Sequence, residues 1–143
     1  MSQSINLYNQ LANHKLFNKK INFGLGRIKL ALTKLSNPQK KLSRVIQVIG
    51  SDGKFTFLNC LKFFIEANKQ TVATHISPSL KDIKERFWMG DRYLTHSEIR
   101  KTIKIIEKLK IPLTVFEVLT LVFIINAAKK NNDFTIMEAG CGW

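Results

Sequence analysis

The chain has 143 residues, 45% of them hydrophobic, which is enough for one compact core and too few for two comfortable domains. The chain has 23 basic and 10 acidic residues, which gives a net charge of +13. This charge indicates polyanionic partners such as nucleotides, nucleic acids or acidic lipids, without choosing among them. The two cysteines form no CxxC pair and no His/Cys cluster, which argues against a zinc site or a disulfide scaffold and fits a reducing cytoplasm.

The first third of the chain predicts two helices and a strand. The N-terminus has no apolar core followed by small residues, so no signal peptide is predicted. Residues 7–17 and 25–35 place apolar side chains at three- and four-residue intervals, as amphipathic helices do. The turn at residues 36–38 ends the second helix. Residues 45–49 are β-branched and almost continuously apolar, which is typical of a buried parallel strand.

A glycine turn separates this strand from the next predicted helix. Helical spacing resumes over residues 55–68, and residues 71–76 predict a second strand. Strand, helix and strand with short connections form a βαβ unit, whose crossover is right-handed almost without exception.

The remainder predicts a loop, two helices and a strand. Residues 77–93 show no hydrophobic periodicity, which predicts a long, charged loop. Thr95 begins a helix, with Glu98 completing a capping box. The very apolar segment 115–128 falls short of the ~20 residues of a membrane span, so it predicts a buried helix. Residues 133–138 predict a third strand.

The turn GSDGKFT, residues 50–56, has the parts of a phosphate cradle. Unpaired amides at a helix N-terminus face an anion, and glycines let the backbone come close. Lys54 can reach terminal phosphates, and the Thr56 hydroxyl can bind Mg²⁺. The spacing is not the common Walker form, so the string taken alone is also consistent with an ordinary turn.

Six other segments accompany this loop. They are GLGRI (24–28), NPQK (37–40), ISPSL (76–80), KERF (84–87), TVFEVLT (114–120) and MEAGCG (137–142). In this order they resemble segments of folylpolyglutamate synthase/dihydrofolate synthase, a member of the Mur ligase superfamily, in which the loop reads GTNGKGS. The resemblance covers about the whole chain and the N-terminal third of a family member.

The resemblance implies an ATP-dependent ligase that joins L-glutamate to dihydropteroate or a folate through an acyl phosphate. ATP and Mg²⁺ are the implied cofactors, with no nucleic acid or membrane partner. Lys54 and Glu138 are the implied catalytic residues: Lys54 would stabilise charge on the transferred phosphoryl group, and Glu138 would hold the Mg²⁺ that bridges the phosphates. The nucleotide would bind to the loop residues Gly50, Ser51, Asp52, Gly53, Lys54, Phe55 and Thr56.

The resemblance also implies a metal shell and substrate contacts. Magnesium would be bound by the oxygens of Thr56, Ser77 and Glu138. Ser77 is equally a good turn former, and Glu138 at a strand end can simply face water. The substrate would contact Ser79, Arg86 and Glu117.

Other polar residues have simpler explanations. Glu117, in an apolar helix, is either paired in the interior or placed at a pocket. His14, His75 and His96 are interpreted as surface or satisfied polar groups.

Three residues depart from the family pattern. Asp52 replaces an Asn and places a negative charge beside phosphates, a repulsion on the order of a few kcal/mol at an effective dielectric near 20. Phe55 replaces a small residue after the lysine, and Ser79 replaces the His of SPHL. The chain also stops at Trp143, where the family continues towards a glutamate-binding domain.

These departures leave other functions open. We expect an incomplete domain of the Mur ligase central type, with the family's C-terminal domain absent. A truncated, catalytically inactive binding or interaction domain is the main alternative, and a small nucleic-acid binder is supported only by the net charge. The expected fold is a three-layer α/β domain, P-loop or Rossmann-like, with a mostly parallel sheet and the phosphate site at the carboxyl ends of its strands.

Overall fold

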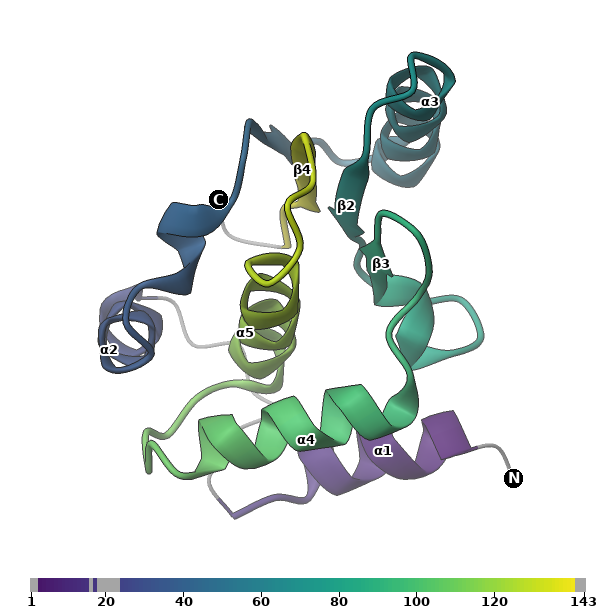
Figure 1. Ribbon diagram of the computed structural model, residues 1–143. Coiled ribbons are helices and arrows are strands. Elements are labelled where there is room, and N and C mark those ends of the chain that lie inside the picture. The colour runs from purple at the N-terminus through teal and green to yellow at the C-terminus, as the bar shows by residue number, and fades with distance from the viewer. Residues whose placement is uncertain (1–2, 16, 18–23, 141–143) are drawn as a thin grey trace.

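A four-stranded sheet organises the computed structural model, which describes residues 3–15, 17 and 24–140 (Figure 1). Its strands lie in the order β1, β4, β2, β3. Their bounds are Val45–Val48, Phe134–Glu138, Val72–His75 and Phe87–Met89. β1, β4 and β2 are parallel, and β3 runs antiparallel to β2. The predicted α/β fold with a mostly parallel sheet is therefore confirmed.

Helices cover the two faces of the sheet unequally (Figure 1). The helix α3 (Lys54–Ala67) packs on one face, where it contacts β4 and β2. On the other face α5 contacts β2 and β3, and four helices, α5 among them, share one apolar cluster on that side. They are α1 (Gln3–Ala12), α2 (Gly26–Lys34), α4 (His96–Glu107) and α5 (Val115–Ala127). Short 3₁₀ helices, η1 (Pro38–Lys41) and η2 (Ile83–Arg86), lie in the connections.

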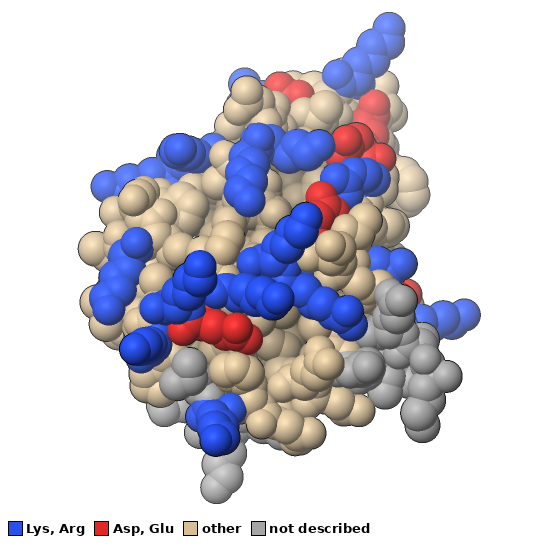
Figure 2. Space-filling model, turned by 60° about the horizontal axis from the view of Figure 1, so that its bottom comes forward, with Lys and Arg blue, Asp and Glu red and all other residues tan. Residues whose placement is uncertain are grey.

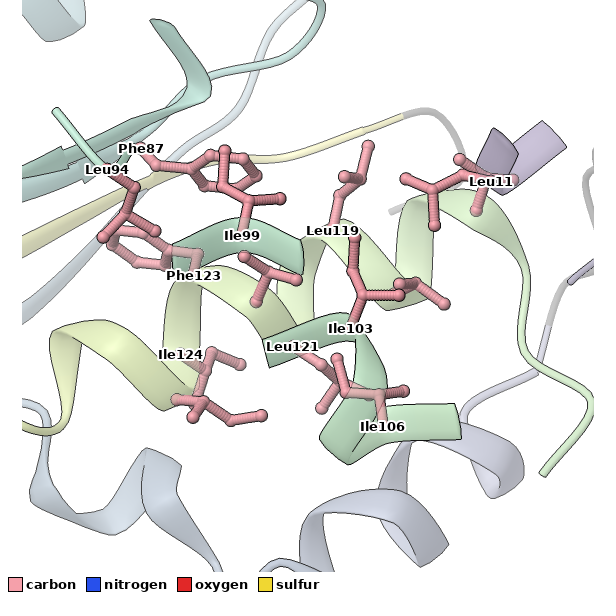
Figure 3. Close-up of a cluster of buried hydrophobic side chains, with 14 of the residues drawn as sticks. Leu11, Phe87, Leu94, Ile99, Ile103, Ile106, Leu119, Leu121, Phe123 and Ile124 are labelled. Carbon is pink, nitrogen blue, oxygen red and sulfur yellow. The ribbon is translucent and has the colours of Figure 1, made fainter. Parts of the chain in front are cut away.

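The larger cluster is built around α5, the apolar segment that the sequence predicts as a buried helix. In Figure 3, Leu119, Leu121 and Phe123 of α5 interdigitate with Ile99 and Ile103 of α4. Phe123 and Leu121 are fully buried. Within the described residues, none of the helices has both the length and the apolarity needed to cross a bilayer.

The predicted loop over residues 77–93 is wrong in part, because η2 and β3 lie within it. Phe87 and Met89 are buried against the larger cluster, and Trp88 between them is half-buried. A strand of three residues and a single 3₁₀ turn are too short to establish a period, so the pattern gives no signal of them.

The first predicted helix, over residues 7–17, is displaced towards the N-terminus. α1 ends at Ala12, and the amide of Phe17 donates to the carbonyl of His14 in a separate turn. Leu16 in that range lies outside the described residues, as do Cys141 and Trp143. Buried apolar residues continue past the helix to Phe17, which is why the sequence extends the helix too far.

The positive charge is spread over the surface. Figure 2 shows a face on which Lys and Arg far outnumber Asp and Glu. On α4 and the turn after it, the exposed basic residues are Lys101, Lys104, Lys108 and Lys110.

Candidate functional site

The glycine turn after β1 forms an open cradle at the N-terminus of α3. Gly50 and Gly53 have φ angles of +148° and +72°, a region that residues with a side chain rarely adopt. Gly53 is the N-cap of α3, and no side chain of the described residues caps the helix. The first amides of α3 are therefore left for an anion or water.

Lys54 folds over this turn. Its Nζ donates to the carbonyl oxygens of Gly50 at 2.7 Å and Ser51 at 3.2 Å. The same nitrogen lies 3.9 Å from Oε1 of Glu138. The lysine thus connects the loop to the end of β4.

Glu138 lies at the carboxyl end of β4, beside the end of β1. The register pairs it with Val48, the last residue of β1. Its side chain is buried, and Oε2 accepts a hydrogen bond of 2.9 Å from the amide of Ser77, which follows β2. Three residues that the sequence predicts as site residues, Lys54, Ser77 and Glu138, thus meet where three parallel strands end, as this fold class requires.

The oxygen atoms around this point suit a magnesium ion. Thr56 lies exposed on the first turn of α3 and carries a hydroxyl, as does Ser77. Among the described residues, no group of three His, Cys, Asp or Glu side chains could bind a metal. One carboxylate and two hydroxyls fit Mg²⁺, which keeps several waters and takes its other ligands from substrate phosphates.

The departures Asp52 and Phe55 both face solvent at the loop. Asp52 is exposed between the two glycines, and the Phe55 side chain is 44% exposed on the first turn of α3. The ring therefore does not fill the turn, and the carboxylate of Asp52 is the feature that opposes phosphate binding.

His75 is the residue whose environment the sequence misses most clearly. Interpreted as a surface or satisfied residue, it is fully buried at the end of β2, and neither ring nitrogen has a hydrogen-bond partner among the described residues. Its ring lies 5.3 Å from that of Phe123 and 5.9 Å from that of Phe87. Burial, aided by the charge of Arg86, lowers the pKa of His75 to about 3. The sequence did carry a signal of this burial, because His75 lies in the predicted strand between the apolar residues Val72 and Ile76.

The other two histidines have carboxylate partners. His14 lies 3.3 Å from Glu107, and His96 lies 3.1 Å from Asp82. Their interpretation as satisfied polar groups is confirmed.

Arg86 is buried at the end of η2, near His75 and Glu138. Burial lowers the pKa of its guanidinium, and the charges of Tyr8 and Glu138 oppose that effect. Its Nε has no partner among the described residues. A buried guanidinium nitrogen without a partner is costly, so a ligand or water at this atom would be favourable.

Glu117 is paired in the interior. Its carboxylate accepts from the amide of Thr114 at 2.7 Å, completing a capping box on α5, and lies 3.3 Å from Arg27. Sequence reasoning missed both the capping box and the pairing with Arg27. The capping box had a signal, because residues 114–117 have the pattern T-x-x-E. Ser79, half-buried in the turn after β2, is two residues from Ser77.

A surface hollow of about 220 Å³ lies away from this site. It is lined by β3, α4 and α5, with Arg92, Lys101 and Lys129 at its rim. None of the predicted site residues lines it.

No family model and no curated protein matches this chain. Several solved structures match it. The Escherichia coli protein FolC in complex with DHPP and ADP is 29% identical with a TM-score of 0.87, covering 99% of this chain and 34% of that chain. A bifunctional folylpolyglutamate synthase/dihydrofolate synthase with Mn, AMPPNP and L-glutamate bound is 26% identical with a TM-score of 0.86, covering 100% and 34%.

A third match comes from Yersinia pestis. This bifunctional folylpolyglutamate synthase/dihydrofolate synthase, complexed with AMPPNP and a Mn ion, is 27% identical with a TM-score of 0.83, and covers 99% of this chain and 34% of that chain. The chain spans about a third of the length of the structures it matches. These structural neighbours confirm the predicted resemblance to folylpolyglutamate synthase/dihydrofolate synthase.

Proposed function

We propose that residues 1–143 form part of the nucleotide-binding domain, of the Mur ligase central type, of an ATP-dependent ligase. The ligase joins L-glutamate to dihydropteroate or a folate through an acyl phosphate. One observation carries the proposal: the glycine loop, Ser77 and Glu138 converge at the carboxyl ends of three parallel strands. The structural neighbours support it, because they contain ADP or AMPPNP, and one contains L-glutamate.

The residues at the loop have separate tasks in this proposal. Bound ATP with Mg²⁺ would supply the phosphoryl group that activates the substrate carboxylate. The loop amides would donate to phosphate oxygens, and Lys54, whose Nζ donates to the carbonyls of Gly50 and Ser51, would supply positive charge to the terminal phosphates. These donors stabilise the charge that develops during transfer.

Glu138 holds the other side of the site. The amide of Ser77 fixes one carboxylate oxygen, and the other oxygen faces Lys54. Its carboxylate and the hydroxyls of Thr56 and Ser77 are the groups that would hold Mg²⁺.

Substrate contacts would lie beyond the phosphate end. We assign them to Ser79 and Arg86, of which Arg86 has the stronger support because its buried Nε lacks a partner among the described residues. Glu117 would act by holding Arg27 and the start of α5 in place.

Nucleotide binding tests the proposal directly. Isothermal titration of Mg²⁺ and ATP into the chain should show binding that Lys54→Ala weakens at least about tenfold, since it removes a charge-assisted contact. Lys108→Ala is the matched control, because Lys108 is exposed directly after α4 and its loss removes the same charge elsewhere. Equal affinities of the two variants would refute the phosphate site.

The second candidate is a domain with no catalytic activity, and Asp52 favours it. An exposed carboxylate between the cradle glycines repels phosphates. Asp52→Asn should then tighten nucleotide binding by about tenfold at low salt, and less at high salt because of screening. ATP-dependent glutamate addition by a protein that retains Asp52 would exclude this candidate.

A further inference from the structure

The hollow lined by β3, α4 and α5 is a second candidate binding site. It shares no residue with the glycine loop, and its volume is about 220 Å³. Pockets that hold drug-sized ligands have ~300–1,000 Å³, so this hollow suits a smaller ligand, such as a compound with a single ring. Its apolar side chains are Met89 in β3, Leu94 just before α4, and Ile105 in α4. Ile105 is 43% exposed and therefore has apolar surface that a ligand can cover.

Contacts between different elements hold the walls of the hollow in place. The Asn126 amide of α5 donates to the hydroxyl of Thr102 in α4 at 2.9 Å. The Asn132 amide donates to the carbonyl of Met89 at 3.2 Å. Gly90 has a φ angle of +98°, and a side chain there would overlap Asn132, so the turn after β3 packs closely on that residue. Walls that are fixed in advance reduce the free energy lost to ordering when a ligand binds.

Four basic side chains line the hollow, and two of them are already paired with carboxylates. Arg92 donates to both carboxylate oxygens of Glu98, at 2.7 and 2.9 Å. Lys130 lies 3.0 Å from a carboxylate oxygen of Asp91. The negative charge of Glu98, which also lines the hollow, is therefore countered and does not by itself exclude an anion.

The other two basic side chains, Lys101 and Lys129, supply the uncountered charge. Both are exposed, and neither has a carboxylate partner among the described residues. Lys101 belongs to α4 and Lys129 follows α5, so the two charges come from different elements around the hollow. The hollow therefore combines an apolar surface with two positive charges.

We propose that this hollow binds a phosphate monoester with a small apolar body. A phosphate monoester carries about 1.5 to 2 negative charges at pH 7, which match the two uncountered lysines. Lysine binds phosphate as a point charge, so Lys101 and Lys129 hold the phosphate together. The apolar body covers Met89, Leu94 and Ile105, which an inorganic anion would leave exposed to water.

Methyl NMR on the full-length protein tests the proposal. The methyl groups of Ile and Met are labelled with ¹³C, and phenyl phosphate, a phosphate monoester with one ring, is added up to ~10 mM at low salt. The methyl signals of Ile105 and Met89, which line the hollow, should shift and saturate. The signal of Ile65, in the smaller cluster on the opposite face of the sheet, should not move.

Two compounds that each carry half of this ligand separate its parts. Inorganic phosphate has the charge without the ring, and benzyl alcohol has the ring without the charge. Each should bind at least about tenfold more weakly than phenyl phosphate, because the apolar contact or the charged contact is lost.

Lysine variants locate the phosphate. Lys101→Met and Lys129→Met should each weaken the binding of phenyl phosphate at least about fivefold, because each removes one charge and keeps an unbranched apolar side chain. Lys108→Met is the matched control, because Lys108 is exposed directly after α4 and does not line the hollow. Its affinity should stay within about twofold of the unchanged protein, since a distant surface charge is largely screened.

The proposal is overturned by any of three results. The first is that the methyl signals of Ile105 and Met89 stay unchanged up to ~10 mM phenyl phosphate, whatever covers the hollow. The second is that the three lysine variants bind phenyl phosphate equally well. The third is that inorganic phosphate or benzyl alcohol binds as tightly as phenyl phosphate.

Discussion

The two faces of the sheet differ in what their apolar residues accomplish. On one face, α5 lies between the sheet and the helices α2 and α4, and ten of its 13 residues are buried. On the other face, α3 buries Leu58 and Ile65 and exposes four phenylalanines, at positions 55, 57, 63 and 64.

This difference separates stability from function. The face around α5 supplies most of the buried apolar surface that stabilises the fold. The face with α3 supplies the helix whose N-terminus follows the phosphate loop. Substitutions that compare the two faces can test this division.

The largest expected contrast is between two buried leucines. Leu121 on α5 and Leu58 on α3 are both fully buried. Leu121→Ala should lower the free energy of unfolding by ~4–5 kcal/mol, because neighbours on all sides cannot close the cavity. Leu58→Ala should lower it by only ~2–3 kcal/mol, because its smaller cluster can relax towards solvent.

Urea denaturation of both variants measures this contrast. Equal losses would mean that the smaller cluster is packed as rigidly as the larger one. The division between the faces would then be wrong.

His75 provides a pH test of the enclosed face. Its folded pKa of about 3 lies below the ordinary value of 6.5, so protons bind preferentially to the unfolded chain. Stability is therefore fully present above pH ~6.5 and is lost as the pH falls towards 3. In His75→Phe that part of the acid loss should disappear, with a gain of the order of 2–3 kcal/mol at pH 4.

Thermal unfolding between pH 4 and pH 7.5 measures this gain. His14→Phe is the control, because His14 pairs with Glu107 near the surface and should show no such gain. An unchanged pH profile in His75→Phe would show that the ring is hydrated or partnered.

Sequence reasoning identifies most of the fold because its signals are local. Short segments rich in β-branched and apolar residues predict β1, β2 and β4, and the glycine turn predicts where α3 begins. β3 and η2 escape it, since three or four residues cannot show a period and β3 is specified by pairing with β2. The strand order also depends on non-local pairing.

The site is predictable to the extent that motifs carry it. Lys54, Ser77 and Glu138 come from segments far apart in the chain, and the ordered resemblance identifies all three before the structure brings them together. His75 and the Arg27 partner of Glu117 are not predictable in this way, because burial and pairing depend on how distant segments pack.

Capping provides a smaller contrast between buried and exposed environments. Thr114 and Thr95 both complete capping boxes, but Thr114 is buried and its partner Glu117 also contacts Arg27. Thr114→Ala should cost ~1.5–2 kcal/mol and Thr95→Ala ~0.5–1 kcal/mol, as measured by urea denaturation. Similar costs would show that the surroundings of α5 add nothing to its cap.

The smallest expected effect is the most informative about α3. Phe64→Ser replaces a ring that is 70% exposed, so the free energy of unfolding should change by no more than ~0.5 kcal/mol. Phe63→Ser, 65% exposed on the same helix, should behave alike in the isolated chain. A loss above ~1.5 kcal/mol for Phe64→Ser alone would mean that its ring already packs within this chain, as a buried aromatic does. Equal, small effects would leave both rings without a role in stability.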